Sequence, residues 1–123
     1  RYFNYIYVRM GAHTLIHKRT EDDIWKNLFE LPLVETEKDL SEEEFLACPQ
    51  FHALFAEGEV RMVRTLLRGV KHVLSHRVIY TNFYEVTLPD NSSSFSSYQR
   101  VAVEDLGRYA VPRLIHAFLE KYV

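Results

Sequence analysis

The stretch Tyr2–Arg9 reads Tyr-Phe-Asn-Tyr-Ile-Tyr-Val-Arg, and it decides the fold because it has the composition of a strand in a protein core. Aromatic and β-branched residues dominate it, as in strands that pack on a pleated surface. Gly11 and Ala12 supply a turn, and His13–Lys18 predicts a returning strand, so we expect a hairpin. Because a core strand follows Arg1 directly, we also expect the chain to be a domain of a larger protein.

The rest of the chain alternates helix signals with strand signals. Ser41 and Glu44 form a capping-box pair before an apolar pair, which marks a helix start. Arg77–Leu88 is the longest strand candidate, and the serine-rich segment 89–97 predicts a mobile surface loop. The order indicates one α+β domain over residues 1–123, with a mixed β-sheet flanked by helices. The other expected elements are an extended piece at 31–34, a helical turn from Pro49 toward Phe55, strands within Val60–Leu88, a strand at Tyr98–Val103 and a closing helix from Pro112.

Composition limits the class of protein. Hydrophobic residues make up 47% of the 123 residues and aromatic residues 14%, which is enough for a core without disulfides or a structural metal. Cys48 is the single cysteine, so it excludes an internal disulfide, leaves a cysteine-based zinc site short of ligands and favours a reducing compartment. No apolar run is long enough to span a membrane.

Charge is distributed unevenly along the chain. The net charge of −2 and the pI near 6.3 argue against a tight, nonspecific DNA binder, which is normally basic. However, acidic residues crowd into 35–44, whereas the segment Val60–Tyr84 contains none. A polyanion could therefore meet the second segment and avoid the first. The cations of the acid-free segment are Arg61, Arg64, Arg68, Lys71 and Arg77.

Motifs for catalysis or metal binding are missing. The histidine pairs His13/His17 and His72/His76 have no further ligand at a suitable spacing, so no metal site is predicted. Neighbours on a strand point to opposite faces, which separates Ser75 from His76 as a catalytic couple. The acidic run at 42–44 is typical of the solvated first turn of a helix. We predict no catalytic residue in this chain.

The segment 71–77, Lys-His-Val-Leu-Ser-His-Arg, is the strongest candidate for a binding site. Lys71, His72 and Arg77 can contact phosphates, and the Ser75 hydroxyl can donate or accept a hydrogen bond. From composition alone, a plain connecting turn with exposed histidines is the commoner interpretation.

Three segments of the sequence favour a binding site at 71–77 over a plain connecting turn. The segment 23–35 reads Asp-Ile-Trp-Lys-Asn-Leu-Phe-Glu-Leu-Pro-Leu-Val-Glu, 72–76 reads His-Val-Leu-Ser-His, and 109–115 reads Tyr-Ala-Val-Pro-Arg-Leu-Ile. In this order they resemble the C-terminal domain of the A/G-specific adenine DNA glycosylases, the MutY family, over essentially the whole chain. The family pattern has Phe where this chain has Leu74.

The resemblance implies a Nudix-like fold, similar to that of MutT, which recognises a lesion and does not hydrolyse nucleotides. The implied partners are double-stranded DNA containing an 8-oxoguanine:adenine pair and the protein's own N-terminal catalytic domain. The implied location is the bacterial cytoplasm, in association with the nucleoid, or the nucleus of a eukaryote. That domain, not this chain, holds the family's 4Fe-4S cluster, so no cofactor is expected here. The implied lesion-sensing loop consists of Leu74, Ser75 and His76, with Leu74 as a smaller apolar wedge in place of the aromatic ring.

The chemistry of Ser75 agrees with this role. The N7 atom of guanine is an acceptor, whereas in 8-oxoguanine it carries a hydrogen and C8 carries a carbonyl. A hydroxyl and neighbouring N–H groups can form hydrogen bonds with both the N7–H and the C8 carbonyl.

Active Nudix enzymes hold magnesium with an Arg-Glu-x-x-Glu-Glu helix after a glycine pair. This chain has Leu33-Val34 after Pro32 and no such helix motif. Two alternatives stay open: an active nucleotide pyrophosphohydrolase, and a protein-docking module that uses the closing helix or the serine-rich loop.

Overall fold

Two β-sheets form the framework of the computed structural model, which describes residues 1–123. The larger sheet is mixed. Its strands β1 (Tyr2–Arg9) and β6 (Arg77–Thr87) are parallel, whereas the other two strand pairs of this sheet are antiparallel. Its strands, in spatial order, are β4 (Leu33–Thr36), β1 (Tyr2–Arg9), β6 (Arg77–Thr87) and β5 (Met62–Leu74). The smaller sheet consists of β3 (Phe29–Glu30), β2 (His13–Lys18) and β7 (Gln99–Ala102).

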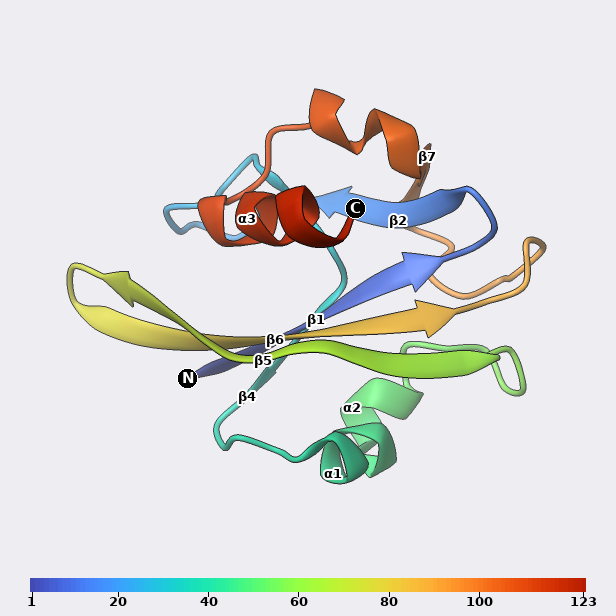
Figure 1. Ribbon diagram of the computed structural model, residues 1–123, viewed down its shortest axis with the longest axis horizontal. Helices are drawn as coiled ribbons and strands as arrows, with labels where there is room; N and C mark the ends of the chain where they lie inside the picture. The colour runs from blue at the N-terminus through green and yellow to red at the C-terminus, as the bar shows by residue number, and fades with distance from the viewer.

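Helices and the smaller sheet cover the two faces of the larger sheet (Figure 1). On one face lie α1 (Glu42–Ala47) and α2 (Pro49–His52); on the other lie β2, the 3-10 helix η1 (Val103–Arg108) and α3 (Arg113–Tyr122). The predicted class, α+β with a mixed sheet flanked by helices, is confirmed. None of the helices is both long enough and apolar enough to cross a membrane.

The alternation of side chains along β1 and β6 divides the core into two clusters. Toward α3, the ring of Phe83 stacks on Tyr5 at 5.4 Å and on Phe118 at 4.2 Å between ring centroids. Toward α1, Phe45 stacks on Tyr84 at 4.6 Å. Each helical layer is therefore attached to the sheet through aromatic rings, which bury more apolar area than any other side chains.

A chain of buried amide hydrogen bonds crosses the larger sheet. Asn4 donates to the carbonyl of Val34 at 3.0 Å, and Asn82 donates to the side-chain oxygen of Asn4 at 2.9 Å. The backbone N–H of Gly69 donates to the side-chain oxygen of Asn82 at 2.8 Å. This chain of contacts joins all four strands in their spatial order and fixes their register.

The predicted first hairpin is only partly correct. The chain turns at Gly11, which has a φ of 60°, but β1 and β2 pair only at the isolated bridge Met10–His13. Both edges of β1 are already taken by β4 and β6, so β2 joins the smaller sheet.

Other boundaries differ from the predicted ones for local reasons. The expected longest strand is wrong, because β5 has 13 residues and β6 has 11. Two register shifts between Thr65 and Val70, with Gly69 at a φ of 67°, break the alternation in β5 and hid its length. The α2 helix ends at His52, short of Phe55, whose ring turns to pack on Phe95. The predicted capping box is confirmed.

The serine-rich segment 89–97, predicted to be mobile, is held in place by one carboxylate. Glu59 accepts hydrogen bonds from the hydroxyls of Ser92 at 2.6 Å and Ser94 at 2.7 Å and from the backbone N–H of Ser93 at 3.1 Å. These donors, the Ser92 hydroxyl first, lower the pKa of Glu59 to about 2. The segment is also anchored by Phe95, whose ring contacts Phe55 and Tyr98.

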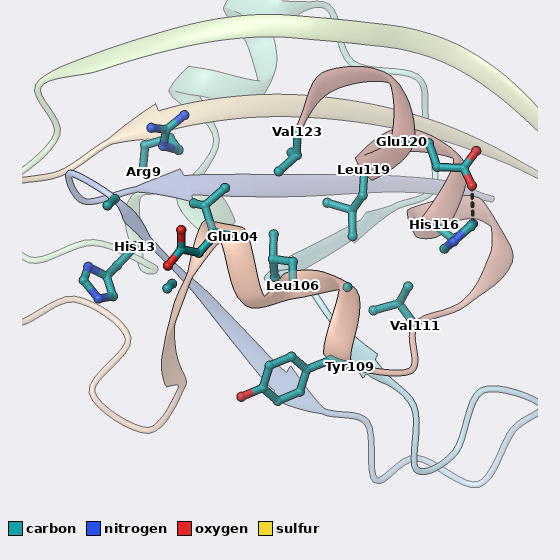
Figure 2. A pocket seen from close by; sticks show the side chains of 14 residues that line it. Arg9, His13, Glu104, Leu106, Tyr109, Val111, His116, Leu119, Glu120 and Val123 are labelled. Atoms are coloured by element: carbon teal, nitrogen blue, oxygen red, sulfur yellow. Dashed lines mark ion pairs between the residues drawn. The ribbon is translucent and has the colours of Figure 1, made fainter.

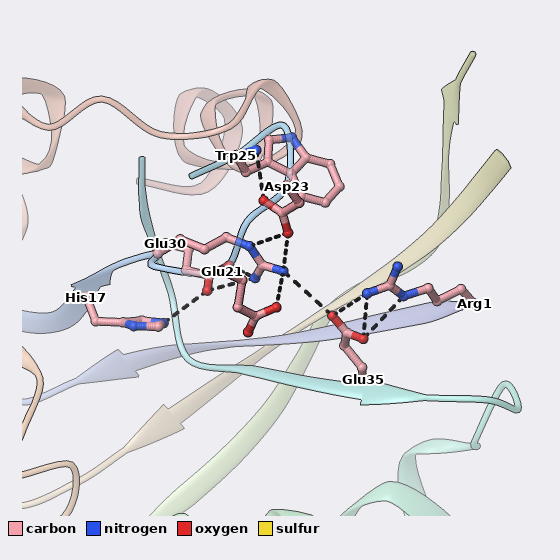
Figure 3. A network of polar contacts seen from close by, with 8 residues as sticks. Arg1, His17, Glu21, Asp23, Trp25, Glu30 and Glu35 are labelled. Atoms are coloured by element: carbon pink, nitrogen blue, oxygen red, sulfur yellow. Dashed lines mark hydrogen bonds and ion pairs between the residues drawn. The ribbon is translucent and has the colours of Figure 1, made fainter. Parts of the chain in front are cut away.

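A buried arginine organises the loop between β2 and β3 (Figure 3). Arg19 is 2% exposed, and its guanidinium contacts Glu30 at 3.1 Å and Asp23 at 2.8 Å. Asp23 in turn accepts a hydrogen bond from the backbone N–H of Trp25 at 2.9 Å, which positions the residue whose indole ring packs on Phe3. The loop is therefore built around one charge that has no access to water.

Replacing Arg19 with Met should strongly destabilise the protein, because it leaves Glu30, 3% exposed, as a buried charge with only the His17 imidazole, 3.0 Å away, as a side-chain partner. We expect a loss of about 3–5 kcal/mol in the free energy of unfolding, measured by urea denaturation at pH 7. Arg1→Met is the control, because it removes an ion pair with Glu35 that is about one-third exposed and should cost less than about 1 kcal/mol. Equal losses in the two variants would contradict this account.

The contact between Glu59 and the serines should appear as a pH dependence of stability. Because the pKa of Glu59 is lowered in the folded state, the ionised carboxylate stabilises the protein above its unfolded pKa, and this effect is lost as the pH falls toward about 2. The melting temperature of the wild type should be higher than that of Glu59→Gln at pH 7, and the difference between the two melting temperatures should shrink below about pH 4.5. A difference that does not change with pH would show that the charge is not involved.

Candidate nucleic-acid interface

The predicted binding segment lies at the tip of the β5–β6 hairpin, which extends beyond both helical layers (Figure 1). Leu74 pairs with Arg77, and Ser75 and His76 form the two-residue turn between them; both turn residues are exposed. Neither has a positive φ, so the turn is not one of the glycine-favouring types common in tight hairpins. The structure therefore brings Ser75 and His76 to the surface, while their role in reading a base stays a prediction.

The side chains next to the turn alternate between two faces. Leu74 lies on the α3 side and packs, half-buried, against the core cluster of that face. Val73, which pairs with Val78 across the hairpin, points to the opposite side and is 66% exposed. Leu74 was predicted as the apolar wedge, but the exposed apolar side chain at this tip is Val73, which the sequence analysis did not select.

The cations of the acid-free segment divide into paired and unpaired groups. Arg64 contacts Glu85 at 2.8 Å, and Arg68 contacts Asp39 at 3.0 Å. In contrast, Lys71, His72 and Arg77 form no ion pair. Arg61, just before β5, also lacks an ion pair and donates to the carbonyl of Gly58. The residues predicted for phosphate contacts, Lys71, His72 and Arg77, lie near the hairpin tip, where they could contact an anionic partner.

The main cavity lies elsewhere, between η1 and α3, and has a volume of about 740 Å³ (Figure 2). Leu106 and Leu119 contribute apolar lining, and the Nδ1 atom of His116 lies 3.3 Å from a carboxylate oxygen of Glu120 at its edge. Arg9 lines the other end, with its Nε buried and without a hydrogen-bond partner. None of the predicted site residues lines this cavity, so it is separate from the hairpin site.

The acidic helix does not have the form of a magnesium site. The segment that follows β4 is broken into α1 and α2 at Cys48 and Pro49. On α1, Glu44 accepts a hydrogen bond from the backbone N–H of Ser41 at 2.9 Å as part of the capping box. No group of three or more His, Cys, Asp or Glu side chains in the chain is arranged to hold a metal ion.

Taken together, the mixed sheet and its helical layers define a small α+β domain with an exposed hairpin at one end. The sequence pattern of the Nudix domain matches residues 4–121. The chain belongs to the Nudix domain family. No relative is found among the sequences of curated proteins.

Solved structures share the fold. The C-terminal domain of mouse MUTYH, in its complex with human PCNA, matches 98% of this chain and 86% of its own length, with a TM-score of 0.72 and 15% identity. The Nudix hydrolase RenU of M. smegmatis matches 98% and 81%, with a TM-score of 0.63 and 8% identity. MutT from Aliivibrio salmonicida or Vibrio cholerae matches 98% and 96%, with a TM-score of 0.62 and 16% identity. At these identities, the likeness shows a shared fold.

Proposed function

We propose that this chain is the 8-oxoguanine recognition domain of an A/G-specific adenine DNA glycosylase and has no hydrolytic activity of its own. The observation that carries the proposal is the exposed Ser75–His76 turn, flanked by unpaired cations and contained in one of the three segments that resemble the MutY family. The fold is also that of the MUTYH C-terminal domain.

The hairpin geometry suits base reading. A two-residue turn at the end of a long, paired β-ribbon is narrow enough to approach a base pair edge, and a serine hydroxyl offers both an acceptor for N7–H and a donor for the C8 carbonyl. Phosphate contacts from Lys71, His72 and Arg77 would hold the turn in register on the duplex, because such contacts position a protein without specifying sequence.

The protein context follows from the same proposal. With a net charge of −2, the chain is expected to bind DNA weakly alone and to depend on the proposed N-terminal catalytic domain for most of the affinity. That domain would extrude and excise adenine from the opposite strand.

Changing Ser75 and His76 together to Ala should reduce the preference for 8-oxoguanine:adenine over guanine:adenine in the full-length protein. We expect a loss of about 1–3 kcal/mol in discrimination, roughly 5- to 150-fold in the ratio of single-turnover rates, measured with enzyme in excess over DNA but below saturation. The control is Ser97→Ala with His52→Ala, which removes an exposed serine and an exposed histidine away from the hairpin. The assigned site is wrong if the ratio stays at the wild-type value.

A second candidate function, nucleotide pyrophosphohydrolysis, is favoured by the hydrolases among the similar structures. Two observations argue against this function: the helix is interrupted at Pro49, and no group of three or more His, Cys, Asp or Glu side chains is arranged to hold a metal ion.

Incubation of the protein with magnesium and 8-oxo-dGTP should release no pyrophosphate above the enzyme-free blank, with Vibrio cholerae MutT as the positive control. The physical reason is that Nudix hydrolysis needs several carboxylates to hold the metal beside the phosphates. Turnover that disappears with EDTA would overturn the assignment of the chain as a recognition domain.

A further inference from the structure

The two faces of the β5–β6 hairpin are unlike each other near its tip. On the α3 side, Leu74 and Ile79 belong to the packed core or lie against it. The other side carries apolar and aromatic groups with one cation, and we call it the open face. The open face consists of Lys71, Val73, Val78 and Tyr80 of the hairpin and Tyr2 of the neighbouring strand β1.

The open face is a continuous surface without a cover. Lys71 pairs with Tyr80, and Tyr80 pairs with Tyr2, so the three side chains lie side by side across three strands. The rings of Tyr2 and Tyr80 stack at 5.6 Å between centroids with 24° between planes. The helices α1 and α2 lie under the other end of the sheet and leave this end free (Figure 1).

The cations near the tip are divided between the two faces, because His72 and Arg77 pair with Ile79 and Leu74 on the α3 side, whereas Lys71 is on the open face. Lys71 forms no ion pair, and β5 and the tip contribute no acidic residue. The α3 side of the same end is bordered by the loop that carries Glu21 and Asp22, because Trp25 of that loop packs on Phe3. Carboxylates also border the open face, because Glu37 follows Thr36, the partner of Tyr2, and Asp39 contacts Arg68 of β5 on that side. The open face differs from the α3 side in exposing Val73 and the stacked rings of Tyr2 and Tyr80 beside Lys71, and this apolar surface is what favours it.

We propose that the DNA strand adjoining the lesion lies against the open face, with Val73 in contact with a sugar or an unstacked base and Lys71 in contact with a phosphate. This inference rests on the proposed function and adds to it the direction from which the hairpin meets DNA. Val73 takes the apolar contact, since it is 66% exposed, whereas Leu74 is half-buried against the core cluster of the α3 side. Uncharged side chains beside a cation are the usual composition of surfaces that hold single-stranded or distorted nucleic acid.

The experiment measures the dissociation constants of the full-length protein for two duplexes, 8-oxoguanine:adenine and guanine:adenine, each with a non-cleavable adenosine analogue. Val73→Ser should weaken binding to both duplexes equally, by about tenfold, because an apolar contact that does not read the lesion is lost. Lys71→Gln should make the plot of the logarithm of the association constant against the logarithm of the salt concentration less steep, with a slope whose magnitude is smaller by about one.

Two matched variants serve as controls. Met62→Ser alters a residue that is 59% exposed at the other end of β5, and Val70→Ser alters one that is 38% exposed on the α3 side of the same strand. Both should bind like wild type. Val73, Met62 and Val70 are each at least one-third exposed, so changing any of them to Ser should not unfold the protein.

Comparison with the Ser75/His76 variant separates the two proposals. If Val73→Ser binds as well as Met62→Ser while the Ser75/His76 variant loses lesion preference, the open face is wrong and the recognition function stands. If Val73→Ser weakens binding while that variant keeps its preference, DNA lies on the open face and the assigned reading site is wrong. If the wild-type protein binds neither duplex, both the recognition function and the open-face proposal are wrong.

Discussion

The hydrogen-bonded pair Asn4–Asn82 is the contact on which the position of the hairpin depends. It joins the parallel strands β1 and β6 at the centre of the sheet, where both side chains are fully buried, and Gly69 extends it to β5. A slip of one residue in either strand would turn an amide to the other face and leave buried polar groups without partners, which is costly in a low-dielectric interior. The pair therefore fixes which side chains of β5 and β6 lie on each face, all the way to the tip.

This constraint also explains the layered shape of the domain. With both edges of β1 occupied, the chain after Gly11 must leave the larger sheet, and β2 then forms a second layer with β7. The α3 helix closes the same side through the Phe83–Phe118 stack. What remains uncovered is the end of the sheet at the start of β1, beside the hairpin.

Local patterns in the sequence were sufficient for some elements and not for others. The aromatic run of β1 and the Ser41–Glu44 capping box are short-range signals, and both were predicted correctly. The length of β5 was missed because its bulges break the alternation on which strand prediction relies. The anchoring of the serine-rich loop was missed because its partner, Glu59, lies more than thirty positions earlier in the chain.

The same reasoning applies to the candidate site. The segment 71–77, selected for its charge and hydroxyl content, contains an exposed two-residue turn at Ser75 and His76, but composition cannot say whether Leu74 or Val73 faces the solvent. That choice is made by the register of β5 on β6, which depends on the bulge at Gly69 and on Asn82, far from the turn itself. A family pattern transfers residue types to positions, whereas the face that a side chain occupies is a property of the whole sheet. The identity of the apolar group that meets a partner therefore has to be taken from the three-dimensional arrangement.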